Sequence, residues 1–190
     1  AKDLDALRFR APDKMNQIII QLGKEFGYPV VEIDSAFNAV SPGGIVGDNL
    51  MTDHLHPTLE GYQLMAMLYF KAMRTANLLP HCTPLQLTDQ QLDSLTRTRF
   101  SFTKLDSIIA DYRIRTLKND WPYIEKKDKK REAELIRPSD FIEKTAYAIL
   151  ADQESWESGQ RKVATWYLGK RDYPAFQNQM DVLISQFPII

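Results

Sequence analysis

Only one stretch of this chain has the pattern of a β-strand, and this constrains the fold more than any other sequence feature. Residues 28–34 form a short run rich in β-branched side chains that ends on Asp34, and Pro29 suits the first position of a strand. The segment before it has apolar residues at helical spacing and a glycine as its stop: Met15, Ile18, Ile19, Leu22, Phe26 and Gly27. A helix that leads into a buried strand predicts one α/β unit of a parallel sheet.

A single strand cannot make a sheet, so this α/β segment is expected to be truncated. Its neighbouring strands would have to come from sequence outside these 190 residues or from another chain. The first residue is Ala1 rather than methionine, and an amphipathic helix is predicted almost at once. We therefore expect a segment of a longer protein.

Helices and one long loop are predicted for the rest of the chain. Residues 35–57 are irregular, and loops of this length inside compact domains are usually functional or disordered. A second apolar helix is predicted over about 58–79, ending before Pro80.

Residues 81–87 are predicted to be a linker, and only helical patterns follow it. Thr88 with Gln91, and Asp140 with Glu143, fit capping boxes at helix starts. The last two helices are expected at about 154–169 and 174–187. The predicted fold class is thus mostly α, with a truncated α/β domain over 1–82 and an all-α helical-hairpin region over 83–190.

The chemically informative stretch is residues 48–62, where Asp53 and His56 lie three apart just before the second helix. In a turn, that spacing lets the carboxylate accept from one imidazole nitrogen, which leaves the other nitrogen free to take a proton. Pro57 keeps His56 out of the helical region, and Thr58 can cap the helix that follows. The pattern predicts an acid–base pair.

Asp53-x-x-His56-Pro57, followed by Gly61-Tyr62 and an apolar helix, resembles the last sequence block of the SGNH (GDSL) hydrolases. The resemblance covers about residues 1–79. It implies a flavodoxin-like α/β/α sandwich, hydrolysis of a small-molecule ester without a cofactor or metal, and catalytic roles for Asp53 and His56. Many members of the family are secreted or belong to the cell envelope, which makes an extracytoplasmic parent protein plausible, although the first ten residues are not a signal peptide.

The sequence lacks other parts of the family pattern. No Gly-Asp-Ser block with the nucleophile precedes Asp53, and the blocks that carry the oxyanion-hole Gly and Asn are missing. The run from Gly47 to Leu50 has Asn49 where that block has serine, and an amide cannot replace the hydroxyl. Ser35 and Ser41 do not fit a strand-to-helix elbow. We therefore expect no esterase activity from this chain alone.

Two other functions compete with the hydrolase interpretation. Asp48, Asp53, His54 and His56 could instead form a metal site, since carboxylate and imidazole suit zinc. The chain could also be a non-catalytic helical interaction or scaffolding module, with a protein partner on its C-terminal helices.

The last two helices weakly resemble a tetratricopeptide repeat in the spacing of Ala164, Tyr167, Tyr173 and Pro188, although Phe176 stands where the repeat usually has alanine. Because one repeat cannot bury its own apolar face, the resemblance implies either a small bundle with the preceding helices or an array that continues.

Composition excludes several partners. The 24 basic and 25 acidic residues leave a net charge of -1, so no global field attracts nucleic acid. No apolar stretch is long enough for a membrane span. Cys82 is the only cysteine, which excludes an internal disulfide framework.

Overall fold

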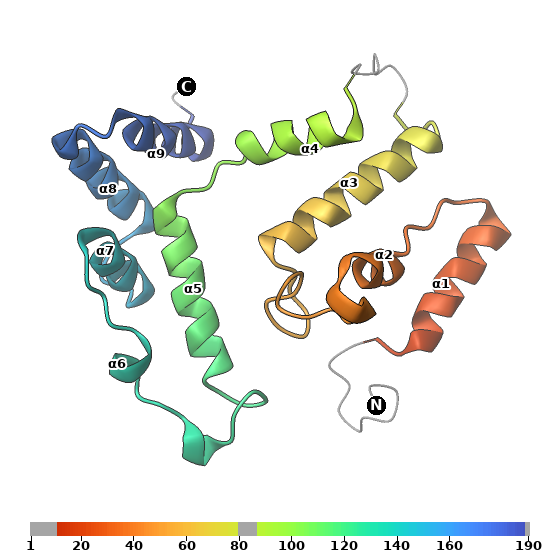
Figure 1. The fold of residues 1–190 in the computed structure, drawn as a ribbon, viewed down its shortest axis with the longest axis horizontal. Coiled ribbons are helices and arrows are strands. Elements are labelled where there is room, and N and C mark those ends of the chain that lie inside the picture. The colour runs from red at the N-terminus through yellow and green to blue at the C-terminus, as the bar shows by residue number, and fades with distance from the viewer. Residues whose placement is uncertain (1–10, 80–86, 189–190) are drawn as a thin grey trace. The chain divides into compact units, whose positions relative to one another are not determined.

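The computed structural model describes residues 11–79 and 87–188, and these residues form two compact units that divide between Arg99 and Phe100 (Figure 1). The predicted linker lies almost entirely outside the described residues, as do His81 and Cys82. No helix in the described ranges is long and apolar enough to cross a membrane.

Unit 1 (residues 1–99) contains four α-helices in its described part: α1 (Asp13–Phe26), α2 (Ile33–Val40), α3 (Leu59–Thr75) and α4 (Asp89–Thr98). The predicted stop of the first helix is confirmed, since Gly27 has a φ of 69° and its N–H bonds the carbonyl of Gly23. The capping box of Thr88 and Gln91 at the start of α4 is also confirmed.

The predicted α/β segment is wrong. The structure has no strand between residues 11 and 79 or between 87 and 188, and the expected strand gives way to α2 at Ile33. A buried extended segment satisfies its backbone mainly through a neighbouring strand, whereas a helix bonds its own N–H and C=O groups. Without such a neighbour, the apolar spacing of Ile33, Phe37 and Val40 favours a helix. The irregular region, which was predicted to begin at residue 35, therefore begins only after α2.

Unit 1 buries few apolar side chains. Phe37 and Leu50 are its only buried large hydrophobic residues among those described. The apolar face predicted for α1 exists, but its members are 40–63% exposed: Met15, Ile18, Ile19, Leu22 and Phe26. Helical periodicity therefore predicted the helix correctly, while the described residues of this unit form no layer that covers its apolar face.

Unit 2 (residues 100–190) is all-α, as expected. Its helices are α5 (Lys104–Lys118), α6 (Glu132–Leu135), α7 (Phe141–Leu150), α8 (Trp156–Lys170) and α9 (Tyr173–Gln186). The capping box of Asp140 and Glu143 opens α7 as predicted. Helices α8 and α9 form a hairpin, α5 packs on α7, and the shared core is formed by eight buried residues: Leu105, Ile109, Tyr112, Ile136, Ile142, Ala146, Ile149 and Val163.

A buried polar network also joins α5, α8 and α9. The Asp106 carboxylate accepts from Trp156 Nε1 at 2.6 Å and from Gln160 Nε2 at 2.8 Å through one oxygen, and from the Thr103 hydroxyl at 2.8 Å through the other. Gln179 of α9 then donates to Gln160. Buried polar groups are stable only when bonded in this way, so the network selects one packing of the three helices.

Candidate functional site

The loop that carries the predicted acid–base pair is closed by its own backbone. Met51 and Pro57 form an isolated antiparallel bridge, the Thr52 N–H donates to the carbonyl of His56 at 2.8 Å, and the Thr58 N–H donates to the carbonyl of Leu50 at 2.8 Å. Leu50 is 6% exposed and anchors the loop in the small core of unit 1. Residues 52–56 therefore form a tight turn held at both ends.

The turn brings Asp53 and His56 together. Asp53 Oδ2 lies 2.7 Å from His56 Nδ1, and Asp53 Oδ1 accepts from the backbone N–H groups of Leu55 at 2.7 Å and of His56 at 2.6 Å. Each carboxylate oxygen is thus used, and the side chain cannot rotate without losing a bond. The predicted three-residue spacing produces the predicted contact.

These bonds also determine the charge of Asp53. Its side chain is 4% exposed, covered by its own turn, and this burial by itself raises the pKa of the carboxyl. The two backbone N–H donors and the imidazole outweigh burial and lower the pKa of Asp53 from 3.8 to about 2. At neutral pH the carboxylate is ionised and can only accept, so the proton of a neutral imidazole resides on Nδ1.

His56 presents its other nitrogen to solvent. The imidazole side chain is 66% exposed, and Nε2 has no hydrogen-bond partner in the part of the chain that the structure describes. Within the same residues no serine hydroxyl contacts the imidazole. Ser41 is buried and accepts from Asn49 Nδ2 at 3.0 Å, and Ser35 lies on α2 with its hydroxyl 3.5 Å from Glu32. The arrangement is an imidazole held by a carboxylate, with no serine hydroxyl hydrogen-bonded to it among the described residues.

Gly61 in the first turn of α3 lets the helix approach this loop. A Cβ at this position would stand 2.4 Å from the carbonyl oxygen of Leu50 and 2.9 Å from Pro57 Cβ. The Thr58 hydroxyl caps the helix by accepting from the Gly61 N–H at 3.1 Å. The glycine of the sequence motif therefore has a steric role, which the spacing of the motif alone did not reveal.

The run that imitates a nucleophile block has a structural role instead. Asn49 Oδ1 accepts from the Gly47 N–H at 3.1 Å while its amide donates to Ser41, and its carbonyl accepts from the Thr58 hydroxyl at 3.3 Å. Asn49 thus connects the start of the loop that carries Asp53 and His56, called the dyad loop below, to the end of α2 and to the cap of α3.

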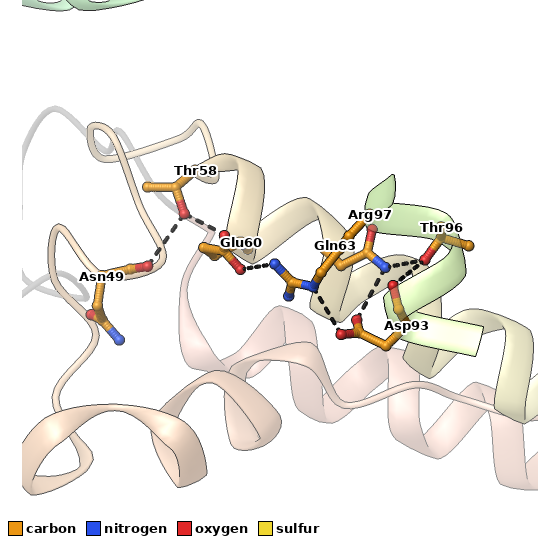
Figure 2. A network of polar contacts seen from close by, with 8 residues as sticks. Asn49, Thr58, Glu60, Gln63, Asp93, Thr96 and Arg97 are labelled. Atoms are coloured by element: carbon orange, nitrogen blue, oxygen red, sulfur yellow. Dashed lines mark hydrogen bonds and ion pairs between the residues drawn. The ribbon is translucent and has the colours of Figure 1, made fainter. Parts of the chain in front are cut away.

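Polar side chains of α4 hold the N-terminal half of α3, as Figure 2 shows. Arg97 donates to Glu60 at 2.5 Å and to Asp93 at 2.8 Å. Gln63 donates to Asp93 at 3.1 Å and to the Thr96 hydroxyl at 2.5 Å. Sequence reasoning missed this contact because the two helices are separated by the predicted linker, and only the Asp93–Arg97 spacing signals one of its bonds.

The alternative metal site is not formed. No group of three or more His, Cys, Asp or Glu side chains in residues 11–79 and 87–188 could hold a metal ion. Asp53 is instead hydrogen-bonded within its own turn, to the backbone of Leu55 and to His56.

Comparison with known proteins gives no match: no protein-family model fits the chain, and no curated protein or solved structure is significantly similar to it.

Proposed function

We propose that Asp53 and His56 are the orienting acid and the general base of a serine ester hydrolase of the SGNH type. The observation that carries this proposal is the 2.7 Å contact between Asp53 Oδ2 and His56 Nδ1, with Nε2 exposed. A buried ionised carboxylate that fixes the tautomer of a histidine with one accessible nitrogen is the acid–base half of a catalytic triad.

In the proposed reaction, Nε2 of His56 removes the proton from a serine hydroxyl as its oxygen attacks the ester carbonyl. The imidazolium that forms is stabilised by Asp53 and returns its proton to the leaving alcohol, and water then releases the acid from the acyl-serine by the same route. The serine and the oxyanion donors are assigned to polypeptide outside the described residues.

Removing the nucleophile from a triad lowers turnover by about 10⁶-fold, so the 190-residue chain is expected to be inactive alone. Hydrolysis of p-nitrophenyl acetate by the purified chain should equal that of free imidazole at the same concentration. Turnover above this background that His56→Ala abolishes would show that the chain supplies its own nucleophile, and the proposed division of the triad would be wrong.

The acid–base role is tested in the complete gene product that contains this chain. His56→Ala should abolish ester turnover and labelling by a fluorophosphonate probe, whereas His54→Ala, two residues away, should retain both. Equal activity of the two variants would overturn the proposal. In the chain itself, nitrogen chemical shifts should report the Nδ1–H tautomer of His56, and Asp53→Ala should lose that preference.

A second candidate function is a helical interaction module, and the exposed apolar face of α1 favours it. In unit 2, the α8–α9 hairpin weakly resembles a tetratricopeptide repeat. We propose this hairpin as the surface that binds a protein partner. If this candidate is the whole function, His56→Ala should leave partner binding and every activity of the gene product unchanged.

A further inference from the structure

Helix α3 carries an apolar stripe that the acid–base pair does not use. Five exposed residues follow one another along it at alternating spacings of three and four: Leu59, Tyr62, Ala66, Tyr69 and Met73. The four large side chains among them are 39–53% exposed. An alternating three–four spacing is the pattern by which one helix packs along another. These five residues, called the α3 stripe, are thus a second uncovered face of unit 1, beside the exposed face of α1, called the α1 stripe.

The other two sides of α3 are occupied. On one side Gln63 donates to Asp93 of α4 at 3.1 Å, and Arg74 pairs with α4 further along. On another side Leu68 and Ala72 lie against the connecting segment 29–32. The α3 stripe lies about a third of a turn from each of these two sides. It is therefore a complete third face of the helix and not the rim of a packed one.

The connecting segment 29–32 lies between α1 and α3. Asn16 of α1 lines a recess against it, and Leu68 of α3 lines another. The two helices run in the same direction, since Gly27 and Ala76, which follow their C-terminal ends, line one shared recess (Figure 1). Helix α1, the connecting segment and α3 thus form one layer.

Both stripes are on the same side of this layer. Viewed from the N-terminus of each helix, the α1 stripe lies about a third of a turn counterclockwise from the side that meets the connecting segment, and the α3 stripe lies about a third of a turn clockwise from it. Because the segment lies between two parallel helices, these opposite rotations direct both stripes to one side. Unit 1 therefore has one apolar surface built from two helices, called the α1–α3 surface.

The α1–α3 surface is as large as a stable interface requires. Its nine large side chains are 39–63% exposed, and at about 90 Å² for each half-exposed side chain they offer about 800 Å² per chain. A standard protein interface buries about the same area on each partner, whereas monomers rarely expose more than a few hundred Å² of contiguous apolar surface. The surface is therefore large enough to hold a partner of its own size.

Charges at the edge of the α1 stripe select the partner and its direction. Lys14 and Glu25 flank the outer edge of the stripe at opposite ends of α1, and neither forms an ion pair among the described residues. Two parallel copies of α1 would place like charges together, whereas two antiparallel copies place Lys14 of each opposite Glu25 of the other. Glu60 and Arg74, which α3 could offer instead, are already paired with α4.

We propose that the α1–α3 surface binds a second copy of the chain about a two-fold axis, with α1 antiparallel to α1 and α3 antiparallel to α3. Each contact is then made twice, and this includes the pair of Lys14 with Glu25. The proposal does not depend on the ester chemistry of Asp53 and His56, and it gives the apolar surface of unit 1 a defined partner.

Sedimentation equilibrium of the full chain tests the proposal. At about 100 µM the chain should have twice the monomer mass. Leu22→Glu, in the centre of the α1 stripe, should weaken dimerisation at least about hundredfold, because it places two unpaired carboxylates in the interface. Gln17→Glu adds the same charge at an exposed position of α1 outside the stripe, and it should change the dissociation constant less than about threefold.

Exchange of the edge charges tests the antiparallel arrangement. Lys14→Glu and Glu25→Lys should each weaken dimerisation by about tenfold, since each variant turns two attractions into two repulsions. The double variant, with both charges exchanged, should restore the dissociation constant to within about threefold of the original. Two residues that only stabilised their own helix would not rescue each other, because they are three turns apart on α1.

Three results would overturn the proposal: a chain that stays monomeric at about 100 µM, equal losses from Leu22→Glu and Gln17→Glu, or a double variant no better than the single ones. A monomer would leave the surface to another polypeptide, such as the one to which the catalytic serine is assigned. If circular dichroism shows that Leu22→Glu is misfolded, Tyr69→Glu in the α3 stripe takes its place, and unchanged dimerisation of that variant would equally refute the proposal.

Discussion

Replacing Gly61 by alanine should disturb the acid–base loop although the residue has no hydrogen bond with Asp53 or His56. The new Cβ would stand 2.4 Å from the Leu50 carbonyl oxygen and 2.9 Å from Pro57 Cβ. Neither atom is the end of a flexible side chain, so α3 and the loop must separate. The same carbonyl accepts from the Thr58 N–H at 2.8 Å, and this bond closes the loop.

The magnitude follows from two opposing terms. Alanine is better than glycine inside a helix by about 1 kcal/mol, whereas forcing an extra carbon into a packed contact costs about 1–3 kcal/mol. We expect Gly61→Ala to destabilise the docked loop by up to about 2 kcal/mol net. Native-state hydrogen exchange at the amides of Leu55 and His56 should then become up to about thirtyfold faster.

Gly169→Ala in α8 is the matched control, because a Cβ there meets nothing within 4 Å. It should only gain helix propensity and stabilise its unit, by at most about 1 kcal/mol. If Gly61→Ala also stabilises its unit against unfolding, and the amide chemical shifts of the dyad loop do not change, the steric reasoning about Gly61 is wrong.

Three further outcomes are expected. Because its pKa is lowered from 3.8 to about 2, the ionised Asp53 stabilises its turn by about 2 kcal/mol. This stabilisation is fully present above pH 3.8 and is lost as the pH falls through about 2. The chemical shift of the His56 amide should therefore change with a midpoint near pH 2, and a midpoint near pH 3.8 would contradict the assignment. Asp106→Asn should lower the free energy of unfolding of unit 2, measured with urea, by about 2–3 kcal/mol. The surface control Glu157→Gln should lower it by less than about 0.5 kcal/mol, and similar losses in the two variants would show that the buried network adds little stability. Arg97→Met should cost less than about 1 kcal/mol, measured by thermal unfolding, because its ion pairs are exposed.

Local chemistry made most helices predictable. The capping residues Thr88 and Asp140, and the stop at Gly27, act within one helical turn of where they stand, so their effects do not depend on the remainder of the chain. The Asp53–His56 contact belongs to the same class. Its two partners are three residues apart and are joined by their own backbone, so the spacing was enough to predict it.

Features that depend on distant partners were not predictable. Gln160 and Gln179 look like surface residues in the sequence, yet both are buried because each finds a partner on another helix. Glu60 and Arg97 are brought together by the packing of α4 on α3. Neither sequence spacing nor composition contains the information about which helices meet.

The sequence by itself determined where several helices start or stop, as at Gly27, Thr88 and Asp140, and that a carboxylate would hold an imidazole before α3. Tertiary structure alone decided that Ile33 begins a helix rather than ending a strand, that the apolar face of α1 stays exposed, and that Gly61 must lack a side chain. The physical reason is range: capping and turn bonds are made within a few residues, whereas a strand or an apolar face is stable only against a partner supplied from elsewhere.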